Sequence, residues 1–357
     1  MKKTIRNTLF ILLSFTIGFT ILYFIFDNYN EAYLEQCQQD NIPLEECDLM
    51  QKLKDDFWSA NPFWVFMALL CFTLSNLSRA VRWNILLRPL GYTPKLYNSF
   101  FAVVITYFVN LFIPRMGEVM RAAALNYAEK VPVEKSMGTI VLGRIMDVVM
   151  LLLLIGLALL LEYDNLWNWL QENLPEGNLF ANPFILGVLG LGILGLILFF
   201  VFKRRIEQFS FYKKVVLIIK GFWEGLLSIR KIENPGWFIF HTIFIWAMYF
   251  LMNYLFFLSF EPTENLSPVV ALMVFVFGAF GIVIPSPGGM GTYHWLVIAA
   301  LGIYGIEQIS AFSFANIAFF SIQVFANIFI GIIAVVLLFL MNKRKKTKVE
   351  EKVEVEV

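Results

Sequence analysis

Residues 110–118 read NLFIPRMGE and interrupt an apolar stretch of the chain, and residues 284–294, which read IPSPGGMGTYH, interrupt another. Proline removes a backbone hydrogen-bond donor and glycine permits left-handed backbone, so neither stretch is expected to continue as a plain helix. Lipid cannot satisfy the freed backbone groups, so such breaks persist in a membrane only where they are buried in protein or line a wet cavity. Paired broken segments in the two halves of a transporter indicate its binding site.

The composition around these breaks is that of a membrane protein. Hydrophobic residues make up 59% of the chain and charged residues 15%, whereas soluble domains contain about 25% charged residues. Several runs approach the roughly 20 residues that cross a hydrocarbon core. We therefore predict an all-α polytopic membrane protein, with its first span kept as an uncleaved anchor because no small-residue cleavage site follows it. The six predicted full spans lie near 8–26, 62–80, 137–161, 183–202, 237–260 and 311–341.

The positive charges predict the orientation of the spans. Of the 28 Lys and Arg, 25 lie at the N-terminus, in 79–135, in 203–231 and in the tail 343–357. Cytoplasmic loops collect Lys and Arg, so both termini are predicted to be cytoplasmic. Within a membrane domain 1–342, the acidic segment 27–60 is then an extracytoplasmic loop. The basic and apolar segment 203–231 is predicted to be a cytoplasmic interfacial helix, and 343–357 a charged disordered tail.

Two cysteines, Cys37 and Cys47, fall in the predicted outer loop. A disulfide and two free thiols both remain open at this point, and Cys71 is expected to pack inside the second span. With three Cys and two His in the whole chain, no dedicated metal site and no cofactor are expected.

Each break falls where the charge pattern does not permit a full crossing. The apolar stretch from Phe100 to Ile113 is short, and both of its flanks are basic, so a single crossing would place one basic flank outside. We predict a re-entrant segment that enters from the cytoplasm and returns at Pro114. Residues 268–306 would enter from the outside and turn at 285–291. The alternative is eight full spans with a few poorly placed basic residues.

The first break carries an arginine pair with a carboxylate between the two members. Arg115, Glu118 and Arg121 are spaced i, i+3, i+6, which would place them on one helical face. Two guanidinium groups can hold a phosphate bidentately, and Glu118 would tune or gate them. A basic cytoplasmic flank explains the two arginines equally well, but it does not explain Glu118.

Arg144 and Asp147 are spaced i, i+3 inside a predicted span, where they can pair and form a gate. A charge at membrane depth is expensive and marks a functional site by default. The alternatives are an ion pair that only fixes helix packing and an Arg144 that reaches the interface.

The second break offers consecutive glycine amides at the start of a helix, an arrangement that binds anions. His294 beside it titrates near neutral pH in an ordinary environment. Farther on, Asn316, Gln323 and Asn327 share one helical face, where interhelical packing is favoured over a polar path. The sequence contains no nucleotide-binding loop and no nucleophile elbow.

Four segments of the chain follow one another in this order: RAVRWNILL at 79–87, NLFIPRMGEVMR at 110–121, RIMD at 144–147 and PSPGGMG at 285–291. In combination, they resemble the lysylphosphatidylglycerol synthase transmembrane-region family, also called flippase-like domains or UPF0104-type membrane proteins. Several members of that family have a glutamate shortly after the glycine loop, where this chain has His294. The candidate head-group or phosphate-binding residues are Arg82, Asn110, Pro114, Arg115, Gly117, Glu118, Arg121, Pro287, Gly288, Gly289, Gly291, Tyr293 and His294.

The resemblance implies binding and translocation of an anionic phospholipid or lipid-linked precursor in the bacterial cytoplasmic (inner) membrane. We expect no aminoacyltransferase domain, so a flippase-like transporter is favoured over an enzyme. Two rival functions remain. One is a membrane enzyme, or an enzyme subunit, that acts on a phospholipid or polyprenyl phosphate. The other is a non-catalytic scaffold for a partner synthase. The expected partners are therefore a lipid, and either a second copy of the chain or a synthase, but no nucleic acid.

Overall fold

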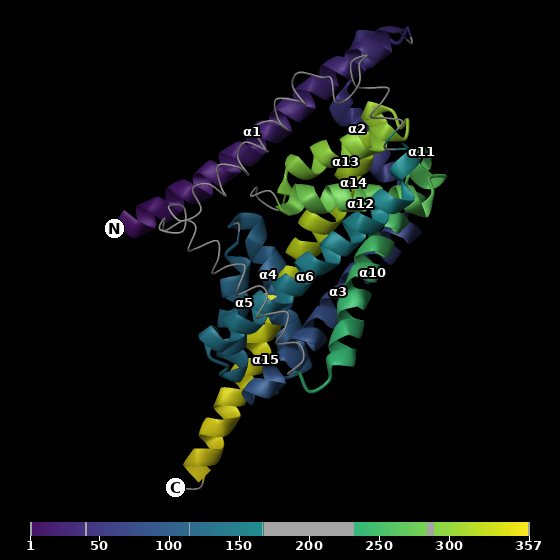
Figure 1. Ribbon diagram of the computed structural model, residues 1–357. Coiled ribbons are helices and arrows are strands. Elements are labelled where there is room, and N and C mark those ends of the chain that lie inside the picture. Colours follow the sequence, from purple (N-terminus) through teal and green to yellow (C-terminus); the bar gives the residue numbers. More distant parts are fainter. Residues whose placement is uncertain are drawn as a thin grey trace, which may run out of the picture. The chain divides into compact units, whose positions relative to one another are not determined.

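The computed structural model describes residues 2–39, 41–113, 115–165, 167, 232–283 and 289–355. Every regular element within these residues is a helix, which confirms the all-α prediction (Figure 1). The chain divides into two compact units, Met1–Ala158 with Ile232–Val357, and Leu159–Lys231. The second unit is described only at its start, so the predicted span 183–202 and the predicted interfacial helix 203–231 lie outside the described residues.

Four stretches among the described residues are long and apolar enough to cross a membrane. They contain α3 (Pro62–Leu87), α6 (Val133–Leu161), α10 (Pro235–Ser259) and a continuous helical run over Gln308–Lys343, and each overlaps a predicted span. The last run joins α14 (Gln308–Phe319) to α15 (Asn327–Val355) through a π-helical segment, Phe320–Ala326. The predicted span 8–26 lies within α1 (Lys2–Gln39).

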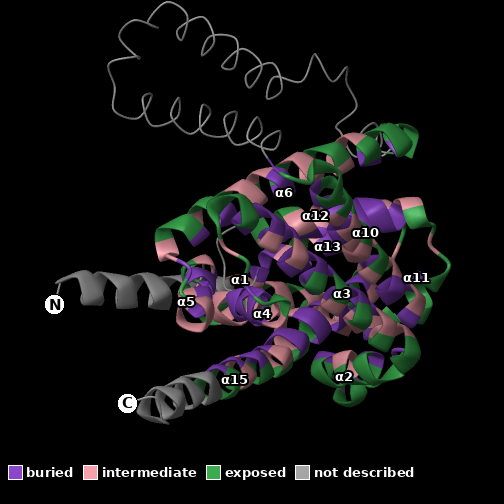
Figure 2. Cartoon of the chain, turned by 90° about the horizontal axis from the view of Figure 1, so that it is seen from below, coloured by how far each residue is buried: buried purple, intermediate pink, exposed green. Residues whose placement is uncertain are grey.

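Apolar side chains remain exposed on these helices, as lipid-facing surfaces require. Val141, Val148 and Leu152 of α6 are all exposed, and exposed residues follow one another along this helix in Figure 2. Exposed apolar surface of this extent is not typical of a soluble monomer.

Helices α3 and α10 pack antiparallel along their length. Ser78 Oγ lies 2.8 Å from His241 Nδ1, and Asn61 N donates to Ser259 O over 2.8 Å. We call the end where α3 finishes and α10 begins the base, and the opposite end the head.

The first break separates α4 (Leu96–Phe112) from α5 (Gly117–Glu129), and the hairpin that they form opens toward the base. Ser99 Oγ donates to Asn84 Oδ1 over 2.6 Å near the end of α3, whereas Tyr107 OH lies 3.0 Å from Tyr249 OH, midway along α10. Helix α4 has 17 residues and therefore spans about 25 Å, less than a hydrocarbon core of about 30 Å.

The second hairpin consists of α12 (Pro268–Val283) and α13 (Thr292–Ile303) and opens toward the head. Asn253 Nδ2 donates to Ala271 O over 2.9 Å near the head end of α10. Deeper in, the rings of Phe275 and Trp246 lie 6.0 Å apart. The two hairpins therefore enter the unit from opposite ends of the α3–α10 pair, as Figure 1 also shows.

The segment 27–60, predicted as a loop, is mostly helical. Helix α1 continues to Gln39, and α2 (Leu49–Ser59) follows a short 3-10 turn, Leu44–Glu46. The reason is that Tyr29 and Tyr33, one turn apart, pack against the apolar core, with the Tyr29 ring 5.2 Å from that of Phe312. Polar residues on the other side of the helix lower the mean hydropathy of this segment, so hydropathy alone does not indicate the contact.

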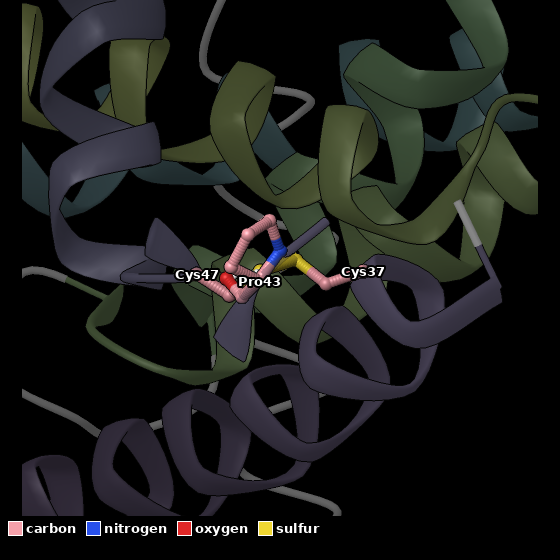
Figure 3. Close-up of a disulfide and its surroundings, with 3 residues drawn as sticks. All are labelled: Cys37, Pro43 and Cys47. Atoms are coloured by element: carbon pink, nitrogen blue, oxygen red, sulfur yellow. Dashed lines mark hydrogen bonds between the residues drawn. A yellow bond between two sulfur atoms is a disulfide. The ribbon is translucent and has the colours of Figure 1, made fainter. Parts of the chain in front are cut away.

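Cys37 and Cys47 form a disulfide, which decides the alternative left open by the sequence (Figure 3). Both cysteines are buried, and the bridge ties the C-terminal end of α1 to the turn before α2. On α2, Asp56 accepts a hydrogen bond from Ser313 Oγ over 2.6 Å, which joins this helix to α14. Cys71 is free and buried.

Candidate functional site

Both breaks line one cavity. Its volume is about 520 Å³, and its wall includes Asn110 and Arg115 from the first hairpin and Gly289 and Tyr293 from the second. The tips of two hairpins that enter from opposite ends thus face a common space. Helices α3, α6, α10 and α14 and the π-helical segment complete the wall.

The wall of the cavity is mostly apolar and aromatic, and its charge is confined to a few residues. Its charged residues are Arg79, Arg115, Glu118, Arg144 and Asp147. Phe72, Trp246, Tyr249 and Phe275 supply aromatic surface. An apolar cleft with a few convergent polar groups is the usual form of a small-molecule site.

Asp147 is held between two arginines of α3. Arg79 Nη1 donates to Asp147 Oδ2 over 2.6 Å, and Arg82 Nη2 donates to Asp147 Oδ1 over 2.8 Å. The side chains of the two arginines and the aspartate are at most 10% exposed. Arg79 also donates to Tyr249 OH over 3.2 Å, and Arg82 to Thr242 Oγ1 over 3.2 Å. Each carboxylate oxygen of Asp147 therefore accepts a hydrogen bond from one arginine of α3.

The predicted pair of Arg144 with Asp147 is wrong in its partners. Arg144 forms its ion pair with Glu118 of α5, while Asp147 pairs with the two arginines of α3. The i, i+3 spacing does place Arg144 and Asp147 on one side of α6, and both line the cavity. Neighbouring helices supply the partners of both residues: α5 provides Glu118 to Arg144, and α3 provides Arg79 and Arg82 to Asp147. Arg79 and Arg82 are spaced i, i+3, so both can bind the same carboxylate.

The predicted single face of Arg115, Glu118 and Arg121 is also wrong. Helix α5 begins at Gly117, so Arg115 lies in the turn before it, with a left-handed φ of 66°. Arg115 is exposed and lines the cavity, whereas Arg121 is buried with its guanidinium 3.9 Å from the centre of the Trp83 ring. The two arginines therefore do not clamp one group together.

Asn110 and Gly117 shape the first turn. Asn110 Oδ1 accepts a hydrogen bond from Gly117 N over 2.8 Å, which fixes the start of α5 against the end of α4. A Cβ at Gly117 would lie 2.1 Å from Thr106 O, so only glycine permits this approach. Pro114 lies outside the described residues.

The second turn is described from Gly289 onward, so Pro287 and Gly288 lie outside the described residues. Gly291, with φ of 80°, precedes α13, and Thr292 Oγ1 donates to Gly281 O over 2.7 Å across the hairpin. His294 does not line the cavity. It is fully buried, with its ring 4.7 Å from that of Phe319.

Several wall residues were not selected from the sequence. Arg79 was visible, since it stands three positions before Arg82 in the quoted motif. Tyr107 and Tyr249 carried no local signal, because their contact joins two helices that are distant in sequence. Gln323, for which the sequence favoured interhelical packing over a polar path, lines the cavity from the π-helical segment, and its Oε1 accepts a hydrogen bond from Asn327 Nδ2 over 2.8 Å. Single π turns occur often at functional sites, but they are not legible in a sequence.

The sequence is similar to those of known membrane proteins. The family model described as Lysylphosphatidylglycerol synthase TM region matches residues 49–331. A UPF0104 membrane protein of Methanocaldococcus jannaschii is 24% identical over 260 residues, which cover 70% of this chain and 77% of that protein. No solved structure matches the chain significantly. The family match and the apolar helices together show a membrane-embedded, multi-pass protein.

Proposed function

Because the chain belongs to the lysylphosphatidylglycerol synthase transmembrane-region family, we propose that it binds an anionic phospholipid or lipid-linked precursor and moves it across the bacterial cytoplasmic membrane. The observation that supports this proposal best is the single cavity lined by both hairpin tips and by arginines from three segments. A lipid head group is anionic at one end and attached to apolar chains, and this wall offers surfaces of both kinds.

The size of the cavity supports a head group as its occupant. About 520 Å³ falls within the range of about 300–1,000 Å³ that is usual for ligand sites. Arg115 and Arg144 would meet the phosphate, since both line the cavity and both are exposed. The backbone at Gly289 would approach it from the second hairpin. The acyl chains would lie along the apolar part of the wall and in the surrounding lipid.

The opposed hairpins support translocation over binding alone. In this proposal the base faces the cytoplasm, because the basic residues Arg88, Lys95 and Lys130 lie near it, and both termini are cytoplasmic. The hairpins are then re-entrant from opposite leaflets and meet at the cavity. Opening one hairpin at a time would expose a central site alternately to each side.

The experiment is a flipping assay in proteoliposomes that contain fluorescent phosphatidylglycerol, read by the fraction accessible to an impermeant quencher. A double variant with Arg115→Gln and Arg144→Gln should lose flipping, because it removes both exposed cavity guanidiniums. The matched control is Arg88→Gln, which makes the same change at an exposed residue outside the cavity wall and should flip normally. Unchanged flipping in the double variant would refute the proposed site. Chemical conversion of the lipid without flipping would instead favour the membrane enzyme.

A further inference from the structure

A second, smaller pocket lies beside the cavity and shares part of its wall. Its volume is about 10 Å³, and Arg79, Arg144 and Asp147 line both spaces. Arg82, Arg121 and Trp83 line the small pocket and do not line the cavity. The ion pairs of Asp147 therefore stand at the boundary between the two.

Positive charge around the small pocket exceeds negative charge. Four guanidiniums line it, from Arg79, Arg82, Arg121 and Arg144. Their only carboxylate partners among the described residues are Asp147, which takes two of them, and Glu118, which takes one. Arginine stays charged in proteins, so the excess persists at any physiological pH.

Arg121 is the cation left over. It is buried, and within the described part of the chain it has no carboxylate partner and its Nε has no hydrogen-bond partner. Its guanidinium lies 3.9 Å from the centre of the Trp83 ring, and Trp83 Nε1 in turn donates to Thr139 Oγ1 over 2.8 Å. Stacking orients the guanidinium but leaves its Nε without a hydrogen-bond acceptor, and a buried charge without an anion is costly.

The volume shows how an anion would have to enter. A pocket of about 10 Å³ holds at most about one water molecule, so an oxyanion group does not fit while Asp147 occupies its present place. If the Asp147 carboxylate turned away, its two arginines and Arg121 would converge on the vacated space. A phosphate could then accept hydrogen bonds from all three guanidiniums.

We propose that the small pocket is a phosphate-type oxyanion site and that Asp147 acts as a built-in competitor, which the ligand's phosphate displaces from Arg79 and Arg82 as it binds Arg121. This inference rests on the proposed function and adds to it a second position for the head group, deeper than the exposed Arg115 and Arg144. The exchange of one anion for another keeps Arg79 and Arg82 paired in both states, and the bound phosphate adds an anion for Arg121.

The test uses the full chain in detergent, with inorganic phosphate as the probe and chloride at equal ionic strength as the reference. Binding is measured by isothermal titration calorimetry and by the phosphate-dependent shift in thermal unfolding. A hydrogen bond to a charged group contributes about 1.5–3 kcal/mol, so Arg121→Gln should weaken phosphate binding by about tenfold or more. Asp147→Asn, which removes the competing charge, should strengthen it by a similar factor. Arg88→Gln, which lies outside both pockets, is the matched control.

Phosphate affinity that is unchanged in Arg121→Gln, or not increased in folded Asp147→Asn, would overturn the proposal. Arg121→Gln leaves both ion pairs of Asp147 intact, so it remains decisive if Asp147→Asn does not fold. The flipping assay separates this inference from the function on which it rests. The expected phosphate effects without any lipid flipping by the wild-type chain would refute the translocase alone. Normal flipping with no effect of Arg121→Gln on phosphate binding would refute the oxyanion site alone.

Discussion

Substitution of Gly117 by alanine should destabilise the protein through the turn of the first hairpin. An added Cβ would lie 2.1 Å from Thr106 O and 2.7 Å from Asn110 Oδ1. The first of these atoms is backbone, so no rotamer change relieves the overlap, and α5 must move away from α4. Overpacking of this kind costs about 1–3 kcal/mol. Loss of the hydrogen bond from Gly117 N to Asn110 Oδ1 adds about 1 kcal/mol.

A matched control exists in α6, where a Cβ added at Gly138 would meet nothing within 4 Å. There the same substitution should stabilise the helix by up to about 1 kcal/mol, because alanine is the better helix former. We therefore expect the two variants to differ by about 2–5 kcal/mol in the free energy of unfolding. Equilibrium unfolding of the purified chain in mixed micelles, followed by circular dichroism, measures this difference. Equal stability of the two variants would refute the geometry assigned to the hairpin.

Three further predictions concern contacts outside that turn. Under denaturing conditions the unreduced chain should take up one maleimide, at Cys71, and reduction should raise the count to three, because Cys37 and Cys47 are bridged; three labels before reduction would contradict the disulfide. Ser313→Ala removes the hydroxyl that donates to the buried Asp56 carboxylate of α2. The free energy of unfolding, measured in micelles, should fall by about 1–2 kcal/mol, and an unchanged value would contradict that hydrogen bond. Trp83→Phe keeps an aromatic ring beside the Arg121 guanidinium but removes the indole N–H that donates to Thr139 Oγ1 of α6. The free energy of unfolding should therefore fall by about 1 kcal/mol, and a gain in stability would contradict that hydrogen bond.

The fold class and the positions of the breaks were accessible from local sequence. Composition and apolar run length predicted membrane helices. The prolines and glycines of the two breaks predicted interruptions, because their backbone chemistry opposes a continuous helix. The count of full spans and the side of each terminus remain predictions, since they depend on a membrane that composition alone does not position.

The ion pairs of the site were not accessible, for a specific physical reason. The spacing of Arg144 and Asp147 reports only on α6, whereas the partners of Asp147 come from α3, 65 and 68 positions away in the sequence. The same limit applies to Arg115, whose exclusion from α5 follows from the packing of Gly117 against α4. Helix-face arguments predict which side chains are neighbours on one helix, but tertiary packing selects the partners.

The π-helical segment Phe320–Ala326 connects the cavity wall, to which it contributes Gln323, with α15. A π turn holds an extra residue relative to an α turn, so its conversion to α-helix would rotate all of α15 by about 100° and shift it by about 1.5 Å. Helix α15 is coupled to the first hairpin, since Asn342 Nδ2 donates to Asn98 Oδ1 over 3.0 Å and Gly331 lies against Phe108. If a ligand at Gln323 brought about that conversion, the rotation of α15 would act on the base end of the first hairpin through these contacts.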